Sequence, residues 1–153
     1  RSLVTEKFSF ANKEIVLLTG TVIELNQVEK NEYITKTDKL IEKVGKDRII
    51  AKPHPRFPNR YGLENDIAEI PYYIPANVLY SVFDTFVGYT SGVLTEVSDN
   101  GLMAISTIDI FKPVNLEKKR NYKNYLLKNR RNKDSVVKFP SSISELIRIL
   151  KWI

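Results

Sequence analysis

EIVLLT, at residues 14–19, is the stretch that decides the predicted fold. Its apolar residues are consecutive and do not alternate with polar ones, which is typical of a β-strand buried on both faces of a parallel sheet. A helical pattern follows over residues 29–44, where Gly45 is a natural end, and a second short strand is predicted over residues 48–52. Strand, helix and strand in this order predict a parallel βαβ unit.

The rest of the sequence continues this alternation. Further strands are predicted at residues 66–70, 85–89, 102–108 and 135–139, and further helices at residues 75–80, 92–97 and 116–129. A final helix runs to about Trp152, and its expected cap is Ser141, Ser142 or Ser144. We therefore predict the α/β class, with a doubly wound, mostly parallel, Rossmann-like sheet that forms a single domain over residues 1–153.

Composition narrows the function classes. The chain has 153 residues, 42% of them hydrophobic, with one histidine and no cysteine. Disulfides, thiolate metal ligands and a cysteine nucleophile are therefore excluded, and no metal site is predicted. The sequence has no apolar run long enough to span a bilayer and no signal-peptide pattern at its start. We expect a reducing, cytoplasmic location, and we expect this chain, which lacks an initiating Met, to be part of a longer protein.

Basic residues between Lys118 and Lys133 contribute much of the net charge of +6. Tyr122 and Tyr125 lie among them, a pattern that single-stranded nucleic acids can use. The simplest interpretation is a solvated basic helix face. The alternative is attraction to an anionic membrane surface or an acidic polymer, and no specific nucleic-acid partner is predicted.

KPHPR, at residues 52–56, follows the second predicted strand and contains the single histidine, His54. The flanking prolines restrict the backbone, so the imidazole of His54 and the guanidinium of Arg56 are carried on a stiff loop. Loops at the carboxyl ends of strands are where open α/β sheets bind ligands. Histidine can donate a proton or a hydrogen bond, and arginine can bind a phosphate or carboxylate through two parallel bonds. The motif therefore predicts an anionic ligand.

Two more loops are expected at the same sheet edge, at residues 19–21 and 88–92. Their glycines let backbone N–H groups approach a phosphate, and the hydroxyls at positions 90 and 91 precede a predicted helix, where anions are favoured. The loops together predict a nucleotide-phosphate site without a Walker or GxGxxG motif. The predicted phosphate-binding residues are Thr19, Gly20, Thr21, Arg56, Thr90, Ser91 and Gly92. Taken singly, each loop also fits an ordinary turn or helix cap.

Four segments carry a family resemblance: LLTG at 17–20, KPHPR at 52–56, IPANVL at 74–79 and GYTS at 88–91. In this order they resemble the C-terminal half of bacterial sialyltransferases, namely the lipooligosaccharide sialyltransferases and the capsular polysialyltransferases. The resemblance extends over roughly residues 14–108. It implies one half of a GT-B glycosyltransferase, with the N-terminal acceptor domain outside this chain.

The resemblance also implies residue roles. His54 would be the catalytic residue that protonates or hydrogen-bonds the departing CMP phosphate, and Arg56, Thr90 and Ser91 would support that phosphate. The nucleotide base and ribose would be contacted by Ile74, Pro75 and Asn77. The sialyltransferases often have Glu where this chain has Asn77, so the contact with the ribose hydroxyls would differ.

The implied reaction transfers sialic acid from CMP-sialic acid to a glycan acceptor with inversion, without a metal or cofactor, and with a general base in the N-terminal domain. Such an enzyme would be cytoplasmic, peripheral at the inner membrane, and active in capsule or lipooligosaccharide biosynthesis. Two alternatives stay open. One is a GT-B transferase with another nucleotide sugar, and the other is a non-catalytic module that binds an anion or a membrane through residues 118–133.

Overall fold

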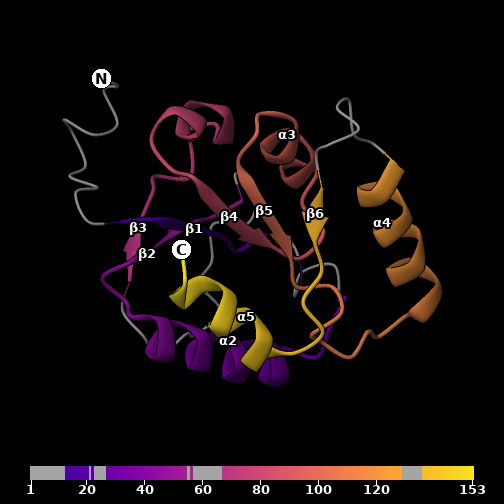
Figure 1. Ribbon diagram of the computed structural model, residues 1–153. Helices are drawn as coiled ribbons and strands as arrows, with labels where there is room; N and C mark the ends of the chain where they lie inside the picture. The colour runs from indigo at the N-terminus through magenta and orange to yellow at the C-terminus, as the bar shows by residue number, and fades with distance from the viewer. Residues whose placement is uncertain (1–12, 21, 23–26, 55, 57–66, 129–135) are drawn as a thin grey trace.

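One parallel sheet organises the protein. The computed structural model describes residues 13–20, 22, 27–54, 56, 67–128 and 136–153. Within these residues the six strands pair in the order β3-β2-β1-β4-β5-β6, and every pair is parallel (Figure 1). The strands are β1 (Ile15–Leu18), β2 (Ile49–Lys52), β3 (Ala68–Glu69), β4 (Thr85–Gly88), β5 (Met103–Ser106) and β6 (Val137–Lys138). This is the strand order of the doubly wound dinucleotide-binding fold, and it confirms the predicted class.

Helices cover both faces of the sheet (Figure 1). On one face lie α2 (Lys30–Val44) and α5 (Ile143–Lys151). On the other face lie the 3₁₀-helix η1 (Ala76–Ser81) and α3 (Val93–Asp99). The basic helix α4 (Leu116–Lys128) stands beside the β6 edge, where its Leu126 shares a hydrophobic cluster with Val137.

The apolar run of β1 is explained by this double covering. Ile15 and Leu17 belong to the hydrophobic cluster under α2 and α5, whereas Val16 and Leu18 belong to the cluster under η1 and α3. Successive side chains of a strand point to opposite faces, so both sets must be apolar. Because each fully buried aliphatic side chain contributes about 1.5–3 kcal/mol, β1 stabilises both layers at once.

Helix ends follow local sequence signals. Glu29 caps α2, because its carboxylate accepts hydrogen bonds from the N–H groups of Asn31 (2.9 Å) and Glu32 (2.7 Å). Gly45 ends this helix at φ 111°, a conformation that favours glycine. Of the three serines proposed to cap α5, Ser142 does so, accepting from the N–H of Glu145 at 3.1 Å.

The differences from the predicted elements are small. The strands predicted at residues 66–70 and 135–139 shorten to β3 and β6, each two residues long, at the two edges of the sheet. Short edge strands expose few unpaired backbone groups. The helix predicted at residues 75–80 is a 3₁₀ turn over Ala76–Ser81, with Pro75 in an extended conformation just before it.

The strand order brings three loops together. β1 lies between β2 and β4, with Leu18 in register with Lys52, and Leu17 with Val87. The strand order reverses between β1 and β4, and ligands of open α/β sheets bind outside the carboxyl ends at such a point. The approach there is close, since a Cβ added at Gly88 would lie 3.2 Å from the Cβ of Leu18.

Candidate functional site

A pocket of about 370 Å³ opens at the carboxyl ends of β1, β2 and β4. We call it the switch-point pocket. The residues that matter to its chemistry are Gly20, Lys52, His54, Pro75, Ser91 and Gly92. Five of these were predicted as site residues from three loops and the IPANVL segment, and the structure gathers them around one space.

His54 is half-buried and lines this pocket. Its Nδ1 accepts a hydrogen bond from the backbone N–H of Arg56 at 3.1 Å. A neutral imidazole that accepts at Nδ1 carries its proton on Nε2. The hydrogen bond from the Arg56 N–H thus orients the ring of the neutral imidazole and favours the Nε2–H tautomer.

Arg56 acts on the motif through its backbone. Its N–H holds His54, while its exposed side chain is not among the residues that line the switch-point pocket. The structure thus gives Arg56 a part in the geometry of the loop, and no arginine is among the described residues that line the pocket.

The two hydroxyls predicted at residues 90 and 91 point to different partners. Ser91 lines the pocket, and its Oγ accepts a hydrogen bond from the N–H of Val93 at 3.2 Å. Thr90 donates from Oγ1 to the side-chain oxygen of Gln27 at 3.3 Å and does not line the pocket. Only Ser91 of this pair is brought to the predicted site.

Thr19 lies at the same corner with a hydroxyl that has no partner among the described residues. Its side chain is 2% exposed, and its Oγ1 is buried without a hydrogen bond. Its backbone N–H donates to the carbonyl of Lys52 at 3.3 Å, which extends the β1–β2 pairing. Buried hydroxyls are nearly always hydrogen-bonded. Thr21, also predicted for this site, lies outside the described residues.

The glycines of the pocket are not required by crowding within the protein. A Cβ added at Gly20 would meet nothing within 4 Å, and one at Gly92 would meet only the Tyr125 hydroxyl, at an ordinary contact distance of 3.6 Å. These positions differ from Gly88, where a Cβ would lie only 3.2 Å from Leu18 of the adjacent strand. No atom of the described residues therefore crowds the Cβ position of Gly20.

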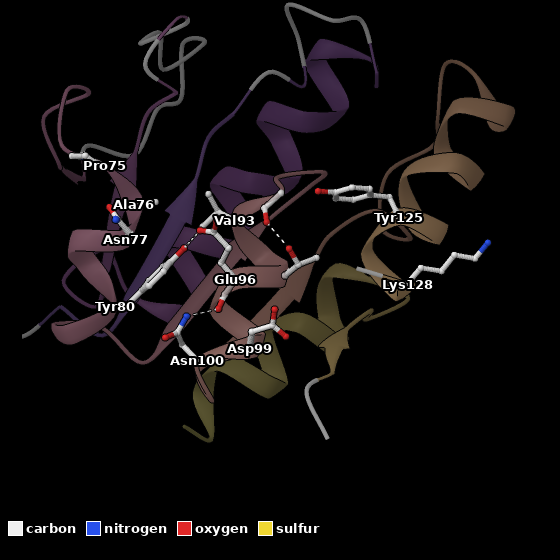
Figure 2. Close-up of a pocket in the computed structure, with 12 residues that line it drawn as sticks. Pro75, Ala76, Asn77, Tyr80, Val93, Glu96, Asp99, Asn100, Tyr125 and Lys128 are labelled. Atoms are coloured by element: carbon white, nitrogen blue, oxygen red, sulfur yellow. Dashed lines mark hydrogen bonds between the residues drawn. The ribbon is translucent and has the colours of Figure 1, made fainter. Parts of the chain in front are cut away.

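A larger pocket of about 1030 Å³ adjoins the first and shares with it Pro75, Ala76, Gly92 and Val93. We call it the outer pocket. Figure 2 shows it between η1, α3 and α4, with Asn77 on one side and Tyr125 and Lys128 on the other. Of the three residues predicted for base and ribose, Pro75 and Asn77 line it, whereas Ile74 is buried and lines neither pocket.

A tyrosine–carboxylate pair lies in the outer pocket and was missed from the sequence. Tyr80 of η1 donates its hydroxyl to Glu96 of α3 at 2.8 Å (Figure 2). Burial, and then the hydrogen bond and charge of Glu96, raise the pKa of Tyr80. The two residues stand 16 positions apart on different elements, so no local pattern indicates that they meet.

Lys52 was also missed as a site residue, although it begins the KPHPR motif. It is 5% exposed, lines the switch-point pocket, and donates from Nζ to the carbonyls of Pro53 (2.9 Å) and Tyr72 (3.4 Å). Burial lowers the pKa of its ammonium group. No carboxylate within the described residues forms an ion pair with it.

The basic helix α4 is partly neutralised. Asp109 binds two of its cations, with oxygen-to-Nζ distances of 3.3 Å to Lys119 and 2.6 Å to Lys123. Arg130, Arg131 and Lys133 lie outside the described residues. No described helix is long and apolar enough to cross a membrane. The described residues also contain no group of three or more potential metal ligands from His, Asp and Glu.

Neither a protein-family profile nor a curated protein sequence matches this chain. Two solved structures do resemble it, both of the wall teichoic acid polymerase TagF. The H444N variant aligns over 97% of this chain and 37% of its own, with 16% identity and a TM-score of 0.59. The second aligns over 92% and 35%, with 14% identity and a TM-score of 0.55.

At these identities the likeness shows the fold. The chain spans little more than a third of the TagF structures, so it corresponds to one part of a longer enzyme there. The fold is thus Rossmann-like and of the kind found in GT-B glycosyltransferases, as predicted. The likeness to TagF does not test whether the chain belongs to the sialyltransferases.

Proposed function

We propose that this chain is the donor-binding domain of a GT-B glycosyltransferase and that the switch-point pocket holds the phosphate of its nucleotide donor. The observation that carries the proposal is the meeting of Gly20, His54 and Ser91 in one pocket at the point where the strand order reverses. These residues come from loops after three different strands. His54 and Ser91 supply side-chain hydrogen-bond donors, and Gly20 supplies backbone without a side chain, where this fold normally binds phosphates.

We propose CMP-sialic acid as the donor, because the four sequence segments resemble sialyltransferases. The phosphate would occupy the switch-point pocket, and the cytidine would extend past Pro75 into the outer pocket. Asn77 and the Glu96 carboxylate are the side chains that suit ribose hydroxyls, since both can accept hydrogen bonds there. Glu96 would then offset the absence of Glu at position 77.

The chemistry follows from the leaving group. The bond between the anomeric carbon and the phosphate oxygen breaks, and its electron pair goes to CMP, while the acceptor hydroxyl attacks the anomeric carbon from the opposite face and gives its proton to a base in the acceptor domain. Negative charge grows on the phosphate, so a donor fixed at that oxygen binds the transition state more tightly than the ground state. We expect neither a metal nor a cofactor in this step.

The hydrogen bond at Nδ1 favours one of the two roles foreseen for His54. With Nδ1 occupied by the Arg56 N–H, the neutral imidazole donates through Nε2–H. A phosphate monoester has its second pKa near 6, so CMP can depart without taking a proton. His54 would therefore act as a hydrogen-bond donor to the departing phosphate.

The likeness to TagF favours a second candidate, a transferase of a cell-wall polymer such as the wall teichoic acid that the TagF structures' name describes. It would use the same pockets with another activated nucleotide. At 16% identity the likeness does not identify the donor, so the nucleotide that the chain prefers must decide between the two candidates. Both candidates require a departing nucleotide phosphate at His54.

The deciding experiment is calorimetry of the 153-residue chain with CMP, UDP and GDP. We expect CMP to bind most tightly, and we expect His54→Ala to weaken it about tenfold or more, the loss of one hydrogen bond to a charged group. Arg56→Ala should weaken it less, because the backbone N–H remains. Arg148→Ala, an exposed arginine on α5, is the matched control.

Other results separate the alternatives. Preference for UDP or GDP, still dependent on His54, would favour a transferase with another donor. Binding that ignores His54→Ala, falls steeply with salt and depends on Lys128, Arg130 and Arg131 would contradict the proposal and favour a polyanion-binding module.

A further inference from the structure

We propose that Lys52 binds the phosphate of the nucleotide donor in the switch-point pocket, beside His54. This assignment rests on the proposed function, and it adds a phosphate-binding cation that the sequence did not indicate. Lysine binds phosphate as a compact point charge, whereas His54 offers a directed neutral donor. The two groups are therefore complementary.

Position is the first support. Lys52 is the last residue of β2 and stands in register with Leu18, directly across from the end of β1. Both residues line the switch-point pocket together with His54 and Ser91. The ammonium is thus carried by a central strand rather than by a surface loop, which fixes its place relative to the pocket.

Uncompensated charge is the second support. Lys52 is the only charged residue that is buried among those described, at 5% exposure. Its hydrogen-bond partners among the described residues are two neutral carbonyls, those of Pro53 and Tyr72. A buried charge is costly unless an opposite charge accompanies it. An anionic ligand in the pocket would supply that opposite charge.

Other lysines of this protein have the carboxylate partner that Lys52 lacks among the described residues. Lys36, Lys119 and Lys123 each pair with a carboxylate, yet their side chains are 36%, 20% and 35% exposed. The lysine that most needs a counter-ion is therefore one without a carboxylate. The unpartnered hydroxyl of Thr19, whose N–H bonds to the Lys52 carbonyl, marks the same corner independently.

The test compares ligands with and without the phosphate. Calorimetry would measure CMP, cytidine and N-acetylneuraminate binding to the wild-type chain and to Lys52→Met and Lys52→Arg. We expect Lys52→Met to weaken CMP about 10- to 100-fold, as for the loss of a charged hydrogen bond, and to leave cytidine unchanged. Lys52→Arg, which keeps the charge, should recover part of the loss.

Lys138→Met is the matched control, because Lys138 is also the last residue of a parallel strand of this sheet but is exposed. It should leave all three affinities unchanged. Circular dichroism and thermal unfolding of each variant would verify folding.

A second measurement needs no variant. Because burial lowers the pKa of Lys52, CMP affinity should fall as the pH rises from 8 toward 10, while cytidine affinity stays level. The other titratable residues next to it are His54, in the same pocket, and Tyr72, whose carbonyl it contacts. CMP is already a dianion above pH 7, so the charge of the ligand does not account for a change in this range.

Each contrary result has its own meaning. Wild-type binding of CMP that Lys52→Met leaves intact would overturn the role of Lys52 and keep the proposed function. Equal losses for CMP and cytidine would make Lys52 a structural residue and overturn its phosphate contact. Loss confined to N-acetylneuraminate would assign the ammonium to the sugar carboxylate instead. Absence of nucleotide binding by the wild-type chain would overturn both proposals.

Discussion

The two ends of β2 carry cations in contrasting states. Arg48, just before the strand, binds the Glu14 carboxylate at 2.7 Å and the Leu150 carbonyl at 3.0 Å, so it ties β1, β2 and the end of α5 together. Lys52, at the other end, is more deeply buried but has only carbonyl partners. The amino-end cation is satisfied within the protein, whereas the carboxyl-end cation is not. We propose that this contrast separates an end of the strand that serves stability from an end that serves a ligand.

The largest expected contrast is between two glycines. Gly88→Ala would press a methyl group against Leu18 at 3.2 Å and should cost about 1–3 kcal/mol in the free energy of unfolding. Gly20→Ala meets open space, so stability should be unchanged or slightly higher, while CMP affinity should fall about tenfold. Urea denaturation and calorimetry measure the two effects. Equal loss of stability in both variants would contradict the comparison.

Arg48→Ala tests the structural end of β2. It removes an ion pair and a hydrogen bond to α5, and should lower the free energy of unfolding by about 1–2 kcal/mol. CMP affinity should stay at the wild-type value, because Arg48 lies at the edge opposite the pocket. Arg148→Ala, exposed on α5, controls for the loss of a surface charge. Weaker CMP binding in Arg48→Ala would break the division of roles.

Thr19→Val asks whether an unpartnered hydroxyl serves a ligand. Replacing a buried, unpaired hydroxyl by a methyl group should raise the free energy of unfolding by about 1 kcal/mol. We expect CMP affinity to fall at the same time. Thr107→Val is the control, because the Thr107 hydroxyl donates to the Gly88 carbonyl at 3.4 Å and its loss should destabilise. A destabilised Thr19→Val chain would show that the hydroxyl is satisfied in solution.

The smallest effect concerns pH. Hydrogen bonds from the backbone and side chain of Ser141 lower the pKa of Glu145, so its contribution is present above the unfolded value near 4.3 and is lost as the pH falls through the lower folded value. Lys52 gives a slope of the same sign at alkaline pH, but there it reflects relief of a buried charge and not a gained interaction. Burial lowers its pKa below about 10.5, so the unfolded chain binds the proton more tightly, and stability rises as the pH increases through that window.

Thermal unfolding between pH 2.5 and 10 would record both slopes. Glu145→Gln should flatten the acid limb slightly, and Glu42→Gln, an exposed carboxylate on α2, should leave it unchanged. Lys52→Met should remove the alkaline rise. An alkaline limb that is identical in wild type and Lys52→Met would contradict the account of an uncompensated ammonium.

Local sequence signals predicted most of the fold. Local signals include the apolar run of β1, the helix-ending Gly45 and the capping serine before α5. The elements lie within a few residues of their expected bounds. The two edge strands came out shorter, because the number of pairing partners depends on the sheet order, which no local pattern contains.

The candidate site was predicted in its loops but not in its charges. His54 and Ser91 follow strands, so their shared sheet edge could be predicted from the parallel topology. The burial of Lys52 could not, because it depends on Tyr72 and on packing across β2. The hydrogen bond from Thr90 to Gln27 could not be predicted either, because the two residues are 63 positions apart in the sequence. Such contacts are set by tertiary structure.

The most direct test of the central claim is an NMR titration of the ¹⁵N-labelled chain with CMP. We predict that the amide signals of Gly20, Lys52 and Ser91 shift together with one saturating affinity, because they surround the proposed phosphate position. Shifts confined to α4, with these three signals unmoved, would contradict a nucleotide-phosphate site at the switch point.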